Sequence, residues 1–280
     1  MERVLLVLTC ALLAGGERVE VAGERILLHN VPAMVAWLTT NRGELRVGEA
    51  IRDAIAECRP GRLFLDVGAN IGAYGIAAAA RGCDTVMFEP QPRCQSYVRE
   101  AIAANHVGQR ARLVPNPIGT PGRTLGVPAD LECEGIYPNN VLRHGEGVAA
   151  LRSKRGFEEV AFVNLTDHVP RGADVAFLKV DVEGAEIDVL TQALPLFRTK
   201  QIRAATIEVS PYLWKWRPLN YAVMAHRVAN ALRDICEMGY VAAVLARTQD
   251  QDVPKISCAQ LHRHVSTCKL PQQDVHFRLP

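Results

Sequence analysis

Two short segments of the chain combine glycines with acidic side chains in a pattern that suits ligand binding. The first runs from Asp66 to Gly72 and reads DVGANIG, directly after a short apolar run. Gly68 allows a sharp turn and lets a ligand approach the backbone, while Gly72 falls at the start of the helix predicted next. Glu89 follows the next apolar run, 21 residues after Gly68. An acid at this distance accepts hydrogen bonds from the two hydroxyl groups of a ribose, so the pattern indicates a nucleoside-containing ligand.

The same residues separate two kinds of cofactor. A dinucleotide-binding loop reads G-x-G-x-x-G, whereas Asn70 stands where the second glycine belongs and would crowd a pyrophosphate. Asp66 suits a cationic or amino-bearing ligand. S-adenosylmethionine (AdoMet), a nucleoside without phosphates that carries a positive centre and an amino acid, fits these features. The predicted cofactor-binding residues are Asp66, Gly68, Asn70, Gly72 and Glu89. An NAD(P)-dependent oxidoreductase, and a non-catalytic binding protein that keeps the fold, are the alternatives.

The second segment runs from Phe177 to Glu186 and reads FLKVDVEGAE. Asp181 and Glu183 fall at the carboxyl end of a predicted strand, where ligands bind in an open α/β sheet. Methyl transfer to a hydroxyl group needs an aligned acceptor and a base within hydrogen-bond reach. We therefore predict Asp181 and Glu183 as the catalytic residues. Two carboxylates can also hold a divalent cation, but no metal is predicted.

Other titratable residues have weaker claims on the site. Glu208 ends a further predicted strand and is a third acid on the same rim. Glu186 and Asp188 are explained equally well by the preference for acids at a helix N-terminus. His144 and His168 are alternative bases, although a lone histidine is more often structural.

The elements that must position these residues alternate between strand and helix. Short apolar runs predict strands at 63–67, 85–88, 112–114, 175–180 and 204–209, and helical spacing falls at 71–81, 92–105, 185–197 and 221–238. This rhythm predicts an α/β fold with a mostly parallel sheet and helices on both faces. Residues 240–245 and 275–279 are predicted to form an antiparallel closing pair.

The remaining segments suggest one main domain with additions. Alternating residues around Ala22-Gly23 predict a hairpin, and 31–58 has helical spacing. Residues 115–156 are rich in glycine and proline and predict an insertion of loop and short antiparallel strands. The predicted organisation is a signal or anchor segment at 1–16, an N-terminal hairpin and helical extension at 17–60, the main domain at 61–246, and a tail with the closing strand at 247–280.

Composition excludes several classes of protein. Hydrophobic residues make up 49% and the formal net charge is +2, which excludes a mostly disordered chain and argues against a nucleic-acid partner. The eight cysteines include no CxxC pair, and a chain this long does not depend on a disulfide scaffold; their pairing is left open. The Cys258, His262, His264 and Cys268 spacing matches no standard zinc site.

The compartment depends on the N-terminus. Val4 to Ala14 is an uncharged run of eleven residues, shorter than the ~20 that span a bilayer. Its length suits the core of a secretory signal, and equally a first buried element. Location is therefore left open between the cytoplasm and a secretory or membrane-associated site, with a membrane partner only if this segment is kept as an anchor.

With these motifs the chain resembles the FkbM family of S-adenosylmethionine-dependent methyltransferases. The resemblance rests on FLDVGANIG at 64–72, FEPQP at 88–92, LKVDVEGAE at 178–186 and Ile207-Glu208, in that order. It implies a class I methyltransferase-like (Rossmann-like) sheet and usually an oxygen acceptor on a sugar or polyketide. The predicted function is therefore O-methylation of a hydroxyl group on a sugar, glycan, lipid or polyketide-type acceptor. It also implies that Asp66, Gly68 and Glu89 hold the cofactor and that Asp181 lies beside it. The chain departs from the family at Thr166-Asp167, where an acid pair is usual.

Overall fold

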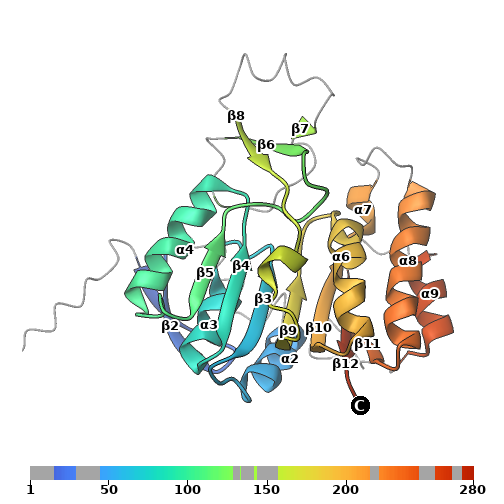
Figure 1. Ribbon diagram of the computed structural model, residues 1–280, viewed down its shortest axis with the longest axis horizontal. Helices are drawn as coiled ribbons and strands as arrows, with labels where there is room; N and C mark the ends of the chain where they lie inside the picture. Colours follow the sequence, from blue (N-terminus) through green and yellow to red (C-terminus); the bar gives the residue numbers. More distant parts are fainter. Residues whose placement is uncertain are drawn as a thin grey trace, which may run out of the picture.

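The computed structural model describes residues 16–29, 45–128, 133, 142–143, 157–214, 221–245, 256–266 and 273–280. Its centre is a seven-stranded sheet in the order β11-β12-β10-β9-β3-β4-β5 (Figure 1). The strands are β3 (Arg62–Val67), β4 (Asp84–Phe88), β5 (Ala111–Val114), β9 (Asp174–Val180), β10 (Ile202–Val209), β11 (Val241–Leu245) and β12 (Gln273–Arg278).

The five strands from β5 to β10 are parallel, and β12 is antiparallel to both β10 and β11. Parallel strands read as continuous apolar runs because both of their faces are covered. In β3, Leu65 packs in one apolar cluster and its neighbour Phe64 in another, and both side chains are fully buried. The α/β fold with a closing antiparallel pair, as predicted from the sequence, is confirmed.

Helices cover both faces of this sheet. One face carries α6 (Glu186–Arg198), α8 (Tyr221–Glu237) and α9 (Cys258–Ser266), which lie side by side in Figure 1. The other face carries α2 (Leu45–Ile55), α3 (Ala73–Arg81) and α4 (Pro92–Ala104). The short α7 (Pro211–Trp214) follows β10. None of the helices in these described ranges is long and apolar enough to cross a membrane.

The predicted hairpin is present as β1 (Gly16–Val21) paired with β2 (Glu24–His29). Ala22 and Gly23 at its turn both have positive φ, 50° and 84°. Such a two-residue turn matches the twist of the strands that it joins. The helix predicted over 31–58 is observed as α2, and residues 30–44 lie outside the described part of the chain.

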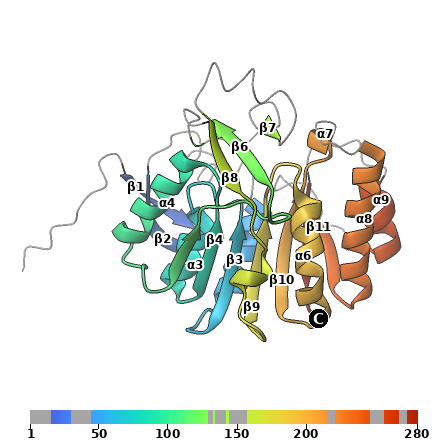
Figure 2. The same ribbon diagram turned by 45° about the horizontal axis from the view of Figure 1, so that its top comes forward.

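The predicted insertion contains a second, antiparallel sheet of β6 (Thr124–Pro128), β7 (Leu142–Arg143) and β8 (Phe157–Ala161). The chain enters it from the carboxyl end of β5. Figures 1 and 2 show this sheet standing over that end of the central sheet. Much of 129–156 lies outside the described residues, and the domain boundaries predicted from the sequence stay a prediction.

Six described cysteines form three disulfides. They join Cys58 to Cys83, Cys94 to Cys133 and Cys236 to Cys258. The predicted tail is partly helical, as α9, and its histidines bind protein groups: His262 contacts Asn230 and His264 contacts Gln273.

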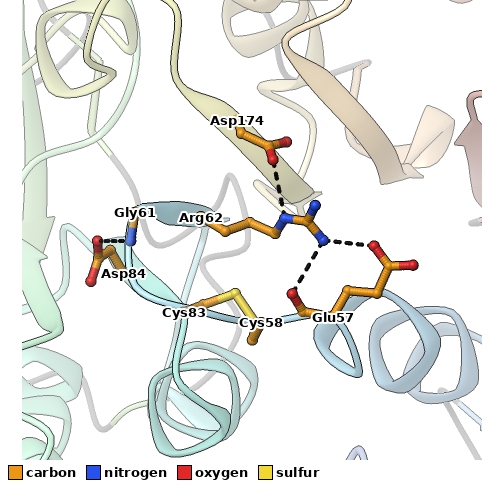
Figure 3. Close-up of a disulfide and its surroundings, with 7 residues drawn as sticks. All are labelled: Glu57, Cys58, Gly61, Arg62, Cys83, Asp84 and Asp174. Carbon is orange, nitrogen blue, oxygen red and sulfur yellow. Dashed lines mark hydrogen bonds and ion pairs between the residues drawn. A yellow bond between two sulfur atoms is a disulfide. The ribbon is translucent and has the colours of Figure 1, made fainter.

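The Cys58–Cys83 disulfide lies at the amino end of the central sheet. Figure 3 shows it beside Arg62, the first residue of β3, whose guanidinium binds Glu57 Oε2 at 2.6 Å and Asp174 Oδ2 at 3.1 Å. This cluster ties the starts of β3 and β9 to the end of α2, far along the strands from the residues that the sequence singles out.

Candidate active site

The candidate site lies at the carboxyl ends of β3, β4, β9 and β10. The helices that follow β3 and β4 cover one face of the sheet, whereas α6, which follows β9, covers the other. The switch point is therefore between β3 and β9, and open α/β sheets bind ligands in the crevice there. The two segments singled out from the sequence follow these two strands.

Glu89 is the anchor of the first half of the site. It is 3% exposed, its Oε2 accepts a hydrogen bond from Asn70 N at 2.8 Å, and its Oε1 accepts one from Gln91 N at 2.9 Å. Burial raises the pKa of its carboxyl to about 7, against the opposing effect of the two amides. The acid is thus held between the loop after β3 and the start of α4, and a carboxylate oxygen can accept more than one hydrogen bond.

Asn70 shapes the loop after β3. Its φ is +53°, in the left-handed region that asparagine tolerates better than most residues. Its Oδ1 accepts a hydrogen bond from Ile71 N at 2.8 Å and lies 3.4 Å from Cys133 Sγ. This conformation points the backbone N–H of Asn70 toward Glu89.

The two glycines of the loop are required by the protein's own packing. A Cβ on Gly68, whose φ is +83°, would lie 1.7 Å from the carbonyl oxygen of Asp181. A Cβ on Gly72 would lie 3.2 Å from Val98 Cγ2 on α4. The sequence pattern suggested ligand approach at Gly68, but the close neighbour there is the backbone after β9.

Asp66 faces the protein interior. It is 1% exposed, its Oδ2 accepts a hydrogen bond from Gly75 N at 3.0 Å, and Lys179 Nζ lies 3.7 Å from its Oδ1. Burial raises the pKa of Asp66, and Lys179 opposes that shift. In this position the carboxylate holds the first turn of α3 against the sheet, and its contact with a cofactor, as expected from the sequence, stays a prediction.

Lys179 is a site residue that the sequence reasoning passed over. Its Nζ donates hydrogen bonds to the carbonyl oxygen of Gly68 at 3.1 Å and to Asp181 Oδ2 at 3.2 Å. It also lies 6.0 Å from the centre of the Tyr74 ring. The available signal was a single charged residue inside an otherwise apolar strand, because a buried lysine needs an anionic partner. The ammonium group links both halves of the site.

Asp181, Glu183 and Glu208 come together on the second half of the rim. Each offers a carboxylate oxygen, and these oxygens all lie within 4.8 Å of one another. Burial raises the pKa of Glu208 well above its ordinary value, and the nearby charges of Asp181 and Asp274 add to the shift. Crowded carboxylates disfavour ionisation of all of their members at once. Such carboxylates are also the ligand type that divalent cations take.

Glu186 is a structural residue. Its Oε1 accepts hydrogen bonds from Gly184 N and Ser210 N, both at 3.0 Å, and its Oε2 accepts one from Trp214 Nε1 at 2.9 Å. The side chain is fully buried. It joins the start of α6 to the end of β10 and to α7. A structural role at a helix N-terminus was one of the two explanations that the sequence offered for this residue.

His168 packs away from the carboxylates. Its ring meets Phe88 edge-on and its Nδ1 lies 3.0 Å from Arg112 Nη1. Partial burial and the Arg112 charge lower its pKa. His144 lies outside the described residues.

Three solved structures give the range of the structural likeness. The chain is 12% identical to a precorrin-6y C5,15-methyltransferase from Geobacter metallireducens, over 83% of this chain and 88% of that one, with a TM-score of 0.38. It is 12% identical to a T. Thermophilus 16S rRNA methyltransferase in complex with AdoMet and guanosine, over 95% of this chain but only 50% of that one, with a TM-score of 0.44. A human methyltransferase 10 domain containing protein is 11% identical over 84% and 83%, with a TM-score of 0.40.

Sequence comparison gives the family directly. No curated protein matches the chain in a sequence search. The model of the methyltransferase FkbM domain matches residues 66–242, which is more than half of the chain and includes the loop after β3, Glu89, Lys179, Asp181 and Glu208. With the mostly parallel sheet and the crevice at its switch point already described, this match places the protein in the FkbM methyltransferase family.

Proposed function

We propose that the protein is an AdoMet-dependent O-methyltransferase whose acceptor is a hydroxyl group on a sugar, glycan, lipid or polyketide-type molecule. The observation that carries the proposal is the placement of Glu89, a buried acid held by two backbone amides at the carboxyl edge of the sheet. Two fixed carboxylate oxygens suit the two adjacent hydroxyl groups of a ribose. The acidic rim as a whole suits a cationic cofactor.

One set of residues binds the cofactor and another acts on the acceptor. When bound, AdoMet supplies a methyl group that is already activated for displacement. Glu89 and the Asn70 loop orient the nucleoside, and Asp181 accepts the proton that the acceptor hydroxyl loses as its oxygen forms the new bond. Lys179 positions Asp181 through its hydrogen bond, and burial together with the charges of Asp181 and Asp274 raises the pKa of Glu208. Glu183 lines the same rim.

Calorimetric titration with AdoMet and with S-adenosylhomocysteine tests the cofactor assignment. We expect both to bind, and Glu89→Ala to weaken binding by about tenfold or more, as expected when a charged hydrogen-bond acceptor is lost. Asp84→Ala is the matched control, because Asp84 is an acid at the amino end of the same strand. Binding of NADH in place of AdoMet would support the oxidoreductase alternative.

A labelled-methyl transfer screen tests the acceptor. Purified protein and labelled AdoMet are incubated with separate pools of glycans, lipids, small molecules and nucleic acids, and the product is identified by mass spectrometry. Label on an oxygen of a glycan, lipid or small molecule is the expected result. Label on nucleic acid would overturn the acceptor class. Cofactor binding without transfer to any pool would favour the non-catalytic alternative.

We also propose that the protein matures in an oxidising compartment, and the three disulfides are the support for this. Protein isolated from its own cells is treated with an alkylating reagent without prior reduction. Mass spectrometry then shows which cysteines carry the added group. The six paired cysteines should stay unmodified, whereas their alkylation would place the protein in a reducing compartment. The same spectrum shows whether residues 1–16 are removed or kept.

A further inference from the structure

One of the three disulfides lies against the loop that carries Asn70. Cys94 belongs to the first turn of α4, which begins three residues after Glu89. Its partner Cys133 comes from the segment between β6 and β7, is 1% exposed, and has its Sγ 3.4 Å from Asn70 Oδ1. The disulfide therefore holds the buried Cys133 sulfur against Asn70, whose backbone N–H donates a hydrogen bond to Glu89.

The loop and α4 form one packed unit around this contact. Val98, one turn after Cys94, packs against Gly72, at the end of the same loop. The backbone N–H of Asn70 donates a hydrogen bond to Glu89, which lies just before the start of α4. The disulfide thus contacts the side-chain oxygen of Asn70 while Glu89 binds its backbone N–H, and Asn70 keeps a left-handed backbone that few non-glycine residues adopt.

The other two disulfides lie elsewhere. Cys58–Cys83 is at the amino end of the sheet, beside Arg62 and Asp84 (Figure 3). Cys236–Cys258 joins the end of α8 to the start of α9. Among the described residues, only Cys133 of the six paired cysteines has a polar contact with Asn70, so the other two disulfides serve as internal controls.

We propose that the Cys94–Cys133 disulfide is a positioning group for the cofactor: it holds Asn70 in the conformation that fixes Glu89, and cofactor affinity depends on it. This inference rests on the proposed function. The physical reason is volume. Bonded sulfur atoms lie about 2 Å apart, whereas two unbonded thiols need roughly 3.5 Å. Breaking the bond therefore displaces Cys133 from its buried place against Asn70. The loop then has to be ordered again when the cofactor binds.

The test compares three double variants in titrations with S-adenosylhomocysteine, each at a temperature where circular dichroism shows the protein folded. The variants are Cys94→Ser/Cys133→Ser, Cys58→Ser/Cys83→Ser and Cys236→Ser/Cys258→Ser. We expect affinity to fall on the order of tenfold in the first variant alone, which is the cost of ordering a released loop. Hydrogen exchange at residues 68–72 should rise in that variant only.

A second experiment keeps the native Cys94–Cys133 pair. A quadruple variant that carries all four control substitutions holds this one described disulfide, and a phosphine reductant then breaks it to two thiols while the phosphine is oxidised. Affinity should fall on reduction and recover when the thiols are reoxidised. Equal affinity before and after, or equal losses in all three double variants, overturns the positioning role. Absence of binding by the oxidised wild type overturns the proposed function as well, so the two failures are distinguishable.

Discussion

Lys179 donates a hydrogen bond of 3.2 Å to Asp181, two residues further along the chain. Asp181 directly follows β9, so the cation near the end of the strand reaches the predicted base in the loop after it. The same ammonium lies 3.7 Å from Asp66, which is fully buried. One side chain therefore offsets charge in both halves of the site.

Replacing this lysine should destabilise the protein in a pH-dependent way. Lys179→Met leaves Asp66 buried without its cation, and we expect a loss of about 3 kcal/mol at neutral pH. The pKa of Asp66 is already raised by burial, and losing the cation raises it further. The deficit should therefore shrink as the pH falls and Asp66 becomes protonated. Urea unfolding at neutral and acidic pH measures this, with the exposed Lys200→Met as the control; an equal deficit at both pH values would contradict the ion pair.

Glu89 predicts a pH dependence of cofactor affinity. Its pKa is raised from 4.5 to about 7, so the carboxyl is protonated below that value. The ionised form accepts the ribose hydroxyl groups, and affinity for S-adenosylhomocysteine should therefore rise by up to about tenfold per pH unit until the pH passes the pKa. Titrations from about pH 5 to about pH 8 check this. Glu89→Gln should bind weakly with a flat profile; a retained slope would assign the dependence to another group.

The same raised pKa predicts the opposite trend for stability. The folded state binds more protons at Glu89 than the unfolded chain does between pH 4.5 and about 7. The contribution of this group to the free energy of unfolding is therefore lost as the pH rises through that window. In wild type, chemical denaturation should show this loss, and Glu89→Gln should reduce it. Opposite slopes for binding and for stability are the expected signature of a buried ligand-binding acid.

Gly68→Ala should be far more damaging than an equivalent change elsewhere. The added Cβ would meet the carbonyl oxygen of Asp181 at 1.7 Å, which forces the ends of β3 and β9 apart and should cost more than about 4 kcal/mol. Gly61 is the matched control, because its φ is +85° and a Cβ there meets nothing within 4 Å. Gly61→Ala should cost only about 1 kcal/mol. Comparable losses in the two variants, measured by denaturant unfolding, would contradict the steric explanation.

Glu186→Gln separates a structural acid from a catalytic one. Three donors converge on this carboxylate, and an amide would turn its own donors toward one of them, at a cost of about 2 kcal/mol. Trp214 fluorescence should change because its indole N–H is one of the three donors. Asp188→Asn, on the same helix turn, should have a smaller effect on both measurements. Unchanged stability with lost methyl transfer would reassign Glu186 to the chemistry.

Much of the fold could be predicted because local and global signals agree. Alternation around Ala22-Gly23 indicates the hairpin, and apolar runs of three to six residues separated by helical spacing indicate the parallel sheet. Helix boundaries are predicted less accurately than the helices themselves. The sequence predicts a helix over 71–81, whereas α3 begins at Ala73. Gly72 has positive φ, which places it before the first helical turn.

The site was predicted less completely for physical reasons. Asp66 and Glu89 both lie near strand ends in the sequence, and only the fold shows that Asp66 binds the first turn of α3 and Glu89 the loop after β3. Lys179 reads as a single interruption of an apolar strand until Asp66 and Asp181 are placed beside it. The disulfides join residues 22 to 39 positions apart, and such pairing depends on distances that composition does not contain.

The position of β12 has a consequence for biosynthesis. This strand follows β11 in the sequence but lies between β11 and β10, with Asp274 opposite Glu208. Until residues 273–278 have emerged from the ribosome, the edges of β10 and β11 stay unpaired, and Glu208 lacks one wall of its surroundings. A nascent chain with exposed strand edges is open to wrong pairing. The acidic rim is therefore completed only after the whole of the FkbM domain, residues 66–242, has been translated.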